Sequence, residues 1–388
     1  MLDFAKLVAD NADSPGVEIQ GQASAQFAGV REAFARHFRD HGEVGASVSV
    51  TLDGESVLDL WGGWRDAART QHWTADTLSA LWSGTKAIAG VCFAMIVDRG
   101  LAAYEDKVSD FWPEFGVAGK ADVTIGQLLS HQAGVAGFAE PANLDDLYGG
   151  EAAAARLAAQ APFWPPGTAA GYHALSVGIL ATALFARIEG RSVKQFVADE
   201  IAGPFGVDVS IGLAAENYAR AAEMIPVPGG ASPLYAAGSP AQIASRNPPM
   251  SGEYPNTPAW RAADLPSANG FGNARALAKL YALLLKPRAD GKALARAEVI
   301  ADATRARTGG IDVIKGVPAR WAAGFSVNVD GIYGPNPEAF YHAGWGGAFA
   351  LADAASGMTI AYTMNRMGDL FDRDPRRQGL IKAVYAAL

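Results

Sequence analysis

Cysteine is nearly absent from this sequence, and the patterns that usually hold metals are missing. The single cysteine, Cys92, cannot form a disulfide within the chain. The six histidines show no His-Glu-x-x-His spacing, and no Cys-x-x-Cys pair occurs. A Walker loop and a Gly-x-Gly-x-x-Gly motif after a predicted strand are also absent. We therefore expect no metal and no organic cofactor.

Long apolar runs and an excess of positive charge are lacking as well. The longest apolar run near a predicted helix, residues 88–97, is far shorter than the ~20 residues that span a bilayer. Residues 1–16 contain acids and no long apolar core, so they do not resemble a signal peptide. A net charge of −8 argues against nucleic acid or an anionic membrane as partner. We expect a cytoplasmic protein that acts on a small molecule, in an oligomeric state that the sequence leaves open.

The composition is that of a folded enzyme. Half of the 388 residues are hydrophobic and 19% are charged, which is typical of compact globular chains. Apolar residues recur every three or four positions in 26–40, which predicts an amphipathic helix. Two β-rich runs then flank Asp53-Gly54, and an Asp-Gly pair in that place predicts a hairpin.

Helical periodicity dominates the middle of the chain, and strands return near its end. Predicted helices begin at Ser83 and after Asn273, and others cover 150–160 and 174–190; the later β-rich segments are 321–329, 340–345, 348–353 and 358–365. This order predicts an α+β fold, with an antiparallel sheet built from both chain ends, flanked by helices, and a helical region inserted. We assign residues 1–80 plus 275–388 to the sheet domain and 81–274 to a mainly helical domain.

Residues 226–260 stand out by their composition. They contain eight prolines and two charged residues, and they include aromatics and methionine. A segment this long is either a flexible tether or an ordered lid over a site. Its apolar side chains favour a lid.

Ser83 and Lys86 lie three positions apart in the sequence Leu-Trp-Ser-Gly-Thr-Lys, where a helix is predicted to begin. One interpretation makes Ser83 a helix N-cap and Lys86 a solvated charge. A capping box, however, has Glu or Gln at the place of Lys86, and a cation there opposes the helix dipole. A buried lysine, in contrast, is driven towards its neutral form and can accept a serine proton. The second interpretation, a nucleophile with its proton acceptor, needs further catalytic groups elsewhere in the chain.

Four segments supply those groups, and together they resemble the serine β-lactamase and penicillin-binding-protein superfamily. Residues 81–86 are similar to its Ser-x-x-Lys motif, and 124–135 to the segment that follows; 165–184 resemble the region of the second motif and 340–353 the third. The resemblance covers about residues 20–385. It is closest to the class C β-lactamase-like branch that includes the family VIII carboxylesterases. It implies a β-lactamase-like fold and a serine hydrolase.

The resemblance also implies roles for individual residues. Ser83 would be the nucleophile that accepts the acyl group, and Lys86 and Tyr172 would activate it, with the choice of base left open. Tyr172 would protonate the leaving group. The backbone N–H groups of Ser83 and Trp345 would form the oxyanion hole. His342, Gly344 and Trp345, from the third motif, would contact the substrate.

Two positions depart from the pattern of class C β-lactamases. Their Tyr-x-Asn motif here ends in Ala174, which cannot bind an acylamino group, and their Lys-Thr-Gly motif reads His342-Ala343-Gly344. A histidine is mostly neutral near pH 7, so it offers no fixed cation for a substrate carboxylate. A charge-assisted hydrogen bond between a cation and a substrate carboxylate would stabilise binding by roughly 1.5–3 kcal/mol. We therefore expect hydrolysis of short-chain, uncharged carboxylic esters, with weak or absent β-lactam hydrolysis.

Two other classes of function are compatible with the same motifs. A class C-like β-lactamase or a D-amino-acid amidase or peptidase is the main alternative, and a non-catalytic binding or assembly protein is a minor one. The retention of Ser83, Lys86 and Tyr172 argues against the latter. Ser176 lacks the first glycine of a Gly-x-Ser-x-Gly elbow and is rejected as the nucleophile. His131 is interpreted as structural.

Overall fold

The computed structural model describes residues 17–227, 235–287, 290–368 and 373–388. Its main element is an eight-stranded antiparallel sheet with strand order β1-β3-β2-β11-β10-β9-β8-β7. Both ends of the chain supply strands, which confirms the predicted origin of the sheet. The strands are β1 (Ile19–Ala23), β2 (Gly45–Leu52), β3 (Glu55–Gly63), β7 (Arg320–Trp321), β8 (Ser326–Val327), β9 (Phe340–Ala343), β10 (Phe349–Asp353) and β11 (Met358–Met364).

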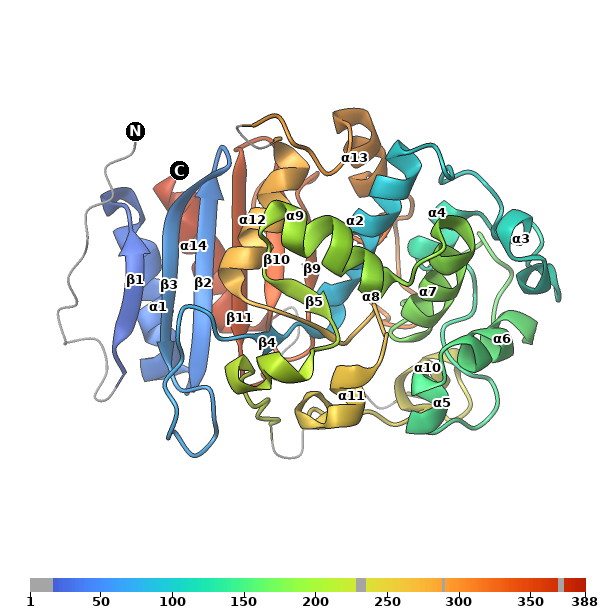
Figure 1. Cartoon of the computed structure of the whole chain (residues 1–388), viewed down its shortest axis with the longest axis horizontal. Coiled ribbons are helices and arrows are strands. Elements are labelled where there is room, and N and C mark those ends of the chain that lie inside the picture. Colours follow the sequence, from blue (N-terminus) through green and yellow to red (C-terminus); the bar gives the residue numbers. More distant parts are fainter. Residues whose placement is uncertain (1–16, 228–234, 288–289, 369–372) are drawn as a thin grey trace.

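The predicted hairpin joins β2 to β3. Asp53 and Gly54 have φ values of 50° and 87°, which is the left-handed pair that a two-residue hairpin turn requires. Strands β2 and β11 pair at the centre of the sheet and are buried on both faces. Helix α12 (Ala274–Leu285) covers one face, and α1 (Ala28–Asp40) and α14 (Pro375–Ala387) cover the other (Figure 1). The Asn273 side chain caps α12, as predicted, by accepting from the Ala276 N–H at 2.9 Å.

The helical part lies beside the sheet in Figure 1. Its central element is α2 (Thr85–Asp98), whose residues 85–96 are all buried. A small sheet with order β4-β6-β5 leads into α2. Predicted helices 150–160 and 174–190 are confirmed as α6 and α7, and the division of the chain into two domains stays a prediction. The remaining elements are β4 (Ser79–Ala80), β5 (Val209–Ile211), β6 (Gly270–Gly272), α3 (Val108–Phe111), α4 (Ile125–Leu129), α5 (Leu144–Tyr148), α6 (Glu151–Ala159), α7 (Ser176–Glu189), α8 (Val193–Phe196), α9 (Gly203–Phe205) and α13 (Ala297–Thr304).

The proline-rich segment forms short helices where the structure describes it. Residues 228–234 lie outside the described part, and the rest contains α10 (Pro240–Arg246) and α11 (Pro258–Ala262). Each of these helices has proline in its first turn, where the missing N–H costs no hydrogen bond. Trp260 of α11 is fully buried in the main core. The described part is therefore anchored, and its role as a lid stays a prediction.

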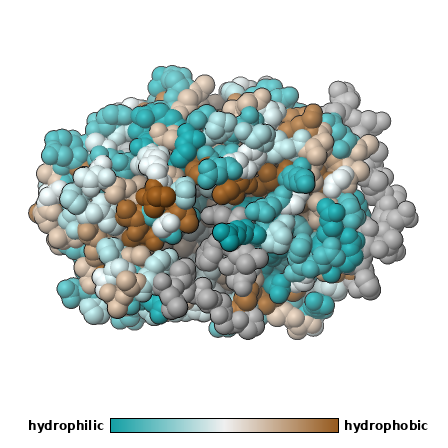
Figure 2. Space-filling view, turned by 180° about the vertical axis from the view of Figure 1, so that it is seen from behind, coloured by the Kyte–Doolittle hydropathy of each residue, from teal (hydrophilic) through white to brown (hydrophobic). Residues whose placement is uncertain are grey.

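The surface carries few hydrophobic side chains. Figure 2 shows a mainly hydrophilic face on which hydrophobic residues gather in separate groups. Three of the exposed large hydrophobic residues, Ile311, Val313 and Val317, belong to the loop between α13 and β7. Across the described ranges, no helix is both long and apolar enough to cross a membrane.

Candidate active site

Ser83 lies in a tight turn, and the helix proper begins after it. Residues Trp82–Gly84 form one 3₁₀ turn, and α2 starts at Thr85, two residues later than predicted. Trp82 has a φ of 48°, which is uncommon for a residue with a side chain and marks a strained backbone next to Ser83. The Thr85 hydroxyl donates to the Trp82 carbonyl at 2.6 Å and holds this turn. Gly84 occupies the N-cap position without a side-chain cap, so Ser83 is not a capping residue.

Lys86 is the residue that contacts Ser83. Its Nζ lies 3.2 Å from the Ser83 Oγ and 2.8 Å from the backbone carbonyl oxygens of Ala174 and Ser267. The Lys86 residue is only 3% exposed, so it is not a solvated charge. Burial lowers the pKa of the Lys86 amine well below its usual value. The side chain that faces the serine is therefore biased towards an uncharged amine.

Tyr172 completes a cluster with these two residues. The Lys86 Nζ lies 4.8 Å from the centre of the Tyr172 ring. That ring stacks on Trp321, with 5.2 Å between ring centres and 15° between planes, and it meets the edge of His131 at 4.9 Å. The fold thus brings together Ser83, Lys86 and Tyr172, three residues taken from two distant motifs.

The third motif runs along the same turn. A Cβ atom on Gly344 would overlap the Leu81 carbonyl oxygen, so the chain passes too close there for any other residue. The Trp345 ring packs against Trp82 with 4.9 Å between ring centres. Gly344 and Trp345 therefore lie beside the turn that carries Ser83, and their roles at the site stay a prediction.

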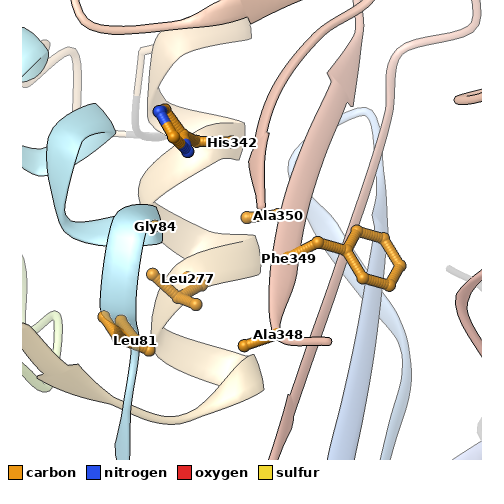
Figure 3. Close-up of a pocket in the computed structure, with 7 residues that line it drawn as sticks. All are labelled: Leu81, Gly84, Leu277, His342, Ala348, Phe349 and Ala350. Carbon is orange, nitrogen blue, oxygen red and sulfur yellow. The ribbon is translucent and has the colours of Figure 1, made fainter. Parts of the chain in front are cut away.

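His342 lies deeper than the other residues of this motif. It is 3% exposed and lines a small cavity, with room for about one water molecule, among the turn that precedes α2, helix α12 and strands β9 and β10. Figure 3 shows its ring at the end of the cavity nearest α2, with Gly84 and Ala350 also on the lining. Burial lowers the pKa of His342 to about 3. The imidazole is therefore neutral near pH 7, and its contact with substrate stays a prediction.

A buried ionic cluster holds the turn that follows Gly344. The Arg376 guanidinium donates to the Gly346 carbonyl at 2.8 Å, and the Gly368 N–H donates to the same oxygen at 2.8 Å. Arg376 also pairs with Glu43 at 2.6 Å and with Asp374 at 2.7 Å, all inside the protein. This arrangement fixes the backbone next to Trp345. Sequence inspection missed it, because the three charged residues come from both ends of the chain.

Aromatic side chains gather on one side of Ser83. Trp82 packs on Trp260 of the proline-rich segment at 5.2 Å between ring centres, and Tyr254 lies 6.4 Å from Trp260. Trp164 lies in a separate apolar cluster together with Tyr172. The surroundings of the serine are therefore apolar and aromatic, which suits an uncharged acyl group.

The two remaining histidines near the site serve the fold. Burial lowers the pKa of His173 to about 4, and burial with nearby cationic groups lowers that of His131 well below its usual value. The His173 Nε2 accepts the Val135 N–H at 3.0 Å, and the His131 Nδ1 accepts the His173 N–H at 3.2 Å. Both rings support the backbone around Tyr172. The Ser176 hydroxyl donates to the Val135 carbonyl at 2.6 Å, which agrees with its rejection as a nucleophile.

Two further residues at the site have no sequence signal. The buried carboxylate of Asp312 accepts the Tyr172 backbone N–H at 3.1 Å, across 140 positions of sequence. The Lys315 Nζ lies 5.8 Å from the centre of the Tyr172 ring. Both residues come from the loop between α13 and β7. Among the described residues, no group of three or more His, Cys, Asp or Glu side chains could hold a metal ion.

Comparison with known proteins places this geometry in a family. The Beta-lactamase family model matches residues 30–384. The chain belongs to the beta-lactamase family. The fold is similar to that in the crystal structure of a family VIII carboxylesterase, with a TM-score of 0.90 and 43% sequence identity. The match covers 96% of this chain and 100% of the carboxylesterase chain. A penicillin-binding-protein homolog from Caulobacter crescentus gives a TM-score of 0.89 and 39% identity, with 96% and 100% coverage.

One curated relative supports the same assignment. The esterase/beta-lactamase LipL of Mycobacterium tuberculosis is 30% identical over 391 residues, which cover 94% of this chain and 87% of that protein. The predicted resemblance and the β-lactamase-like fold are thereby confirmed. This member of the beta-lactamase family is a serine hydrolase of the β-lactamase and penicillin-binding-protein superfamily.

Proposed function

We propose that this protein is a carboxylesterase that cleaves short-chain, uncharged esters through an acyl-enzyme on Ser83. The contact that carries the proposal is that of the Lys86 Nζ with the Ser83 Oγ at 3.2 Å. Two backbone carbonyls take two of the Lys86 hydrogens. A neutral amine held in this way directs its lone pair at the serine hydroxyl.

Acylation begins when the Ser83 Oγ attacks the ester carbonyl carbon. Its proton passes to the pair formed by Lys86 and Tyr172, and the division between these two groups is left open. Negative charge collects on the carbonyl oxygen, where the backbone N–H groups of Ser83 and Trp345 would receive it. Among the described residues, none accepts a hydrogen bond from the Trp345 N–H, which supports that role.

The tetrahedral intermediate then loses the alcohol. The C–O bond to the leaving group breaks as Tyr172 donates a proton to that oxygen, which leaves an ester on Ser83. In the second half, water attacks the acyl carbon and gives its proton to the same pair of groups. The bond to the Ser83 oxygen breaks, the serine recovers its proton, and a carboxylic acid is released.

The preference for uncharged esters follows from the second and third motifs. Ala174 provides no side-chain amide for an acylamino group, and His342, whose pKa burial lowers to about 3, provides no cation for a substrate carboxylate. The aromatic surroundings of Trp82, Trp260 and Trp345 favour an apolar acyl group. The relatives support the choice, because one is a carboxylesterase and another is named both esterase and beta-lactamase. A cytoplasmic location stays a prediction from the sequence.

One observation favours the alternative, a β-lactamase or an amidase or peptidase for D-amino acids. The side chain of Lys315, which is not part of any of the motifs, places a cation near Tyr172. A carboxylate on the substrate would gain from such a charge, by an amount that solvent screening reduces at an exposed lysine. The ratio of cephalosporin to ester turnover decides between the two functions.

Hydrolysis of p-nitrophenyl butyrate by the purified protein and by Ser83→Ala tests the proposal. We expect clear activity in the wild-type protein and its loss in the variant, with slow hydrolysis of the chromogenic cephalosporin nitrocefin. Undiminished activity of Ser83→Ala would exclude Ser83 as nucleophile. Fast nitrocefin turnover with poor ester turnover would establish the alternative.

A further inference from the structure

Asp312 is a buried carboxylate that ties the loop 311–318 to the site. It is 1% exposed. Its Oδ1 accepts three backbone N–H groups, from Tyr172 at 3.1 Å, from Ile314 at 2.9 Å and from Lys315 at 2.8 Å. Its Oδ2 accepts the indole N–H of Trp321 at 2.9 Å. Both carboxylate oxygens of Asp312 thus accept hydrogen bonds.

These bonds control Tyr172 from two directions. The Tyr172 backbone is fixed directly, and the Tyr172 ring is fixed through Trp321, on which it stacks at 15° between planes. A further bond from the Val313 N–H to the Ala170 carbonyl, at 2.9 Å, holds the loop to the segment before Tyr172. Loss of the carboxylate would therefore loosen both the backbone and the ring contact of Tyr172.

The choice of a carboxylate at this position has a chemical reason. All four partners of Asp312 are donors, and an ionised carboxylate is a side chain that only accepts. Asparagine at position 312 would have the same size, but its NH₂ group would face the Trp321 N–H. Two hydrogen-bond donors would then meet with no acceptor between them. Burying a charge is costly. The four hydrogen bonds that Asp312 accepts help to offset that cost.

We propose that Asp312 is a positioning residue that holds Tyr172 in place for proton transfer to the leaving group. This inference rests on the function proposed above, in which Tyr172 protonates the departing alcohol. Among the described residues, Asp312 forms no hydrogen bond with Ser83 or Lys86, so it acts through Tyr172. Loss of the Asp312 carboxylate should therefore slow the hydrolysis of an ester more strongly when its leaving group must be protonated to depart.

The test uses two esters that share one acyl group. p-Nitrophenolate is weakly basic and leaves without a proton, whereas ethoxide is strongly basic and must be protonated as it leaves. In Asp312→Asn we expect kcat/KM for ethyl butyrate to fall at least about tenfold more than kcat/KM for p-nitrophenyl butyrate, with the loss in kcat. Tyr172→Phe should show the same discrimination in stronger form. Glu338→Gln, an exposed carboxylate changed to an amide, serves as the matched control and should change neither ester.

A second variant covers the case in which Asp312→Asn does not fold. Trp321→Phe keeps the carboxylate and the stacked ring but loses the N–H that binds Asp312, so it should discriminate in the same direction. The result counts for any of these variants whose melting temperature is close to that of the wild-type protein. If kcat/KM for the two esters falls by the same factor in such a variant, Asp312 does not position Tyr172. Ser83→Ala separates the two proposals. If it remains active the proposed function fails, and if it is inactive while Asp312→Asn does not discriminate, only the role of Asp312 fails.

Discussion

The Lys86 amine nitrogen lies 3.2 Å from the Ser83 hydroxyl oxygen, and its other two hydrogen bonds end on backbone carbonyls. The carbonyls hold the nitrogen in place but carry no charge that would keep it protonated. Burial disfavours the ammonium form and lowers the pKa of Lys86 well below its usual value. The arrangement therefore favours an amine that can accept the serine proton.

Activity should accordingly fall as pH falls. Protonation of Lys86 removes the acceptor for the Ser83 proton, so we expect kcat/KM for p-nitrophenyl butyrate to rise with pH and then level off. The plateau should begin well below the ordinary lysine range, because the pKa of Lys86 is lowered. Lys86→Ala should lose activity by about 10²–10⁴-fold at every pH. A pH profile that rises only in the ordinary lysine range would contradict the assignment.

The same pKa shift predicts how stability depends on pH. Between the lowered pKa of Lys86 in the folded state and its ordinary value in the unfolded state, the unfolded chain binds more protons. The free energy of unfolding therefore rises with pH across this window. Lys86→Met removes the titrating group, so the wild-type protein should gain stability relative to this variant between pH 7 and pH 9.5. Urea denaturation of both proteins at the two pH values measures the gain, and a constant difference would mean that Lys86 stays charged when folded.

His342 should not contribute to the pH profile. Its pKa is lowered to about 3 by burial, so the imidazole stays neutral over the range in which the enzyme is assayed. We expect His342→Asn to leave the midpoint of the kcat/KM profile unchanged, even if the maximal rate drops. A shift of the midpoint in this variant would show that His342 titrates in the assay range and that the imidazole is coupled to the reaction.

Local signals predicted the parts of the molecule that local geometry decides. Asp53 and Gly54 occupy a hairpin turn because their own backbone preferences allow it, and Asn273 caps a helix because its side chain reaches the next turn. Ser83 and Lys86 meet because residues three apart on one turn face the same way. The α2 helix begins two residues later than predicted, because residues Trp82–Gly84 form a 3₁₀ turn before it, with a positive φ at Trp82 that the sequence pattern does not reveal.

Groups brought together by the tertiary fold left no such signal. Asp312 reaches Tyr172 across 140 positions, and Arg376 contacts both Gly346, 30 positions before it, and Glu43, near the other end of the chain. A lone aspartate or arginine in a loop or helix looks like any solvated charge until its partners are known. The motifs located the reacting residues, whereas the groups that hold them appear only in the structure.

Gly344 should tolerate no side chain. A Cβ atom there would overlap the Leu81 carbonyl oxygen, so the turn that carries Trp345 must shift away from Ser83 in Gly344→Ala. We expect kcat to fall about 10²-fold or more through a disturbed oxyanion hole, and stability to fall by about 1–3 kcal/mol. Gly29→Ala in α1, where a Cβ has open space, is the matched control and should gain up to about 1 kcal/mol. An active, stable Gly344→Ala would contradict the proposed position of the oxyanion donor.

Arg376 offers a test of whether the turn must be held rigid. Arg376→Met leaves Glu43 and Asp374 buried without their cation, which should cost about 3–5 kcal/mol of stability. Arg376→Lys keeps the charge but loses the planar fork that reaches the Gly346 carbonyl as well. We therefore expect Arg376→Lys to fold, with kcat for p-nitrophenyl butyrate lowered and KM little changed.

The control for this pair is Arg39→Lys on the outer surface of α1. Arg39 pairs with Glu32 in solvent, where exchange of one cation for another leaves the charge in place and the pair well hydrated. Its melting temperature and kcat should match those of the wild-type protein. If Arg376→Lys also keeps the wild-type kcat, the Gly346 contact serves the fold alone, and the backbone N–H of Trp345 is aligned without it. A selective loss of kcat in Arg376→Lys would instead link the buried ionic cluster to the oxyanion hole.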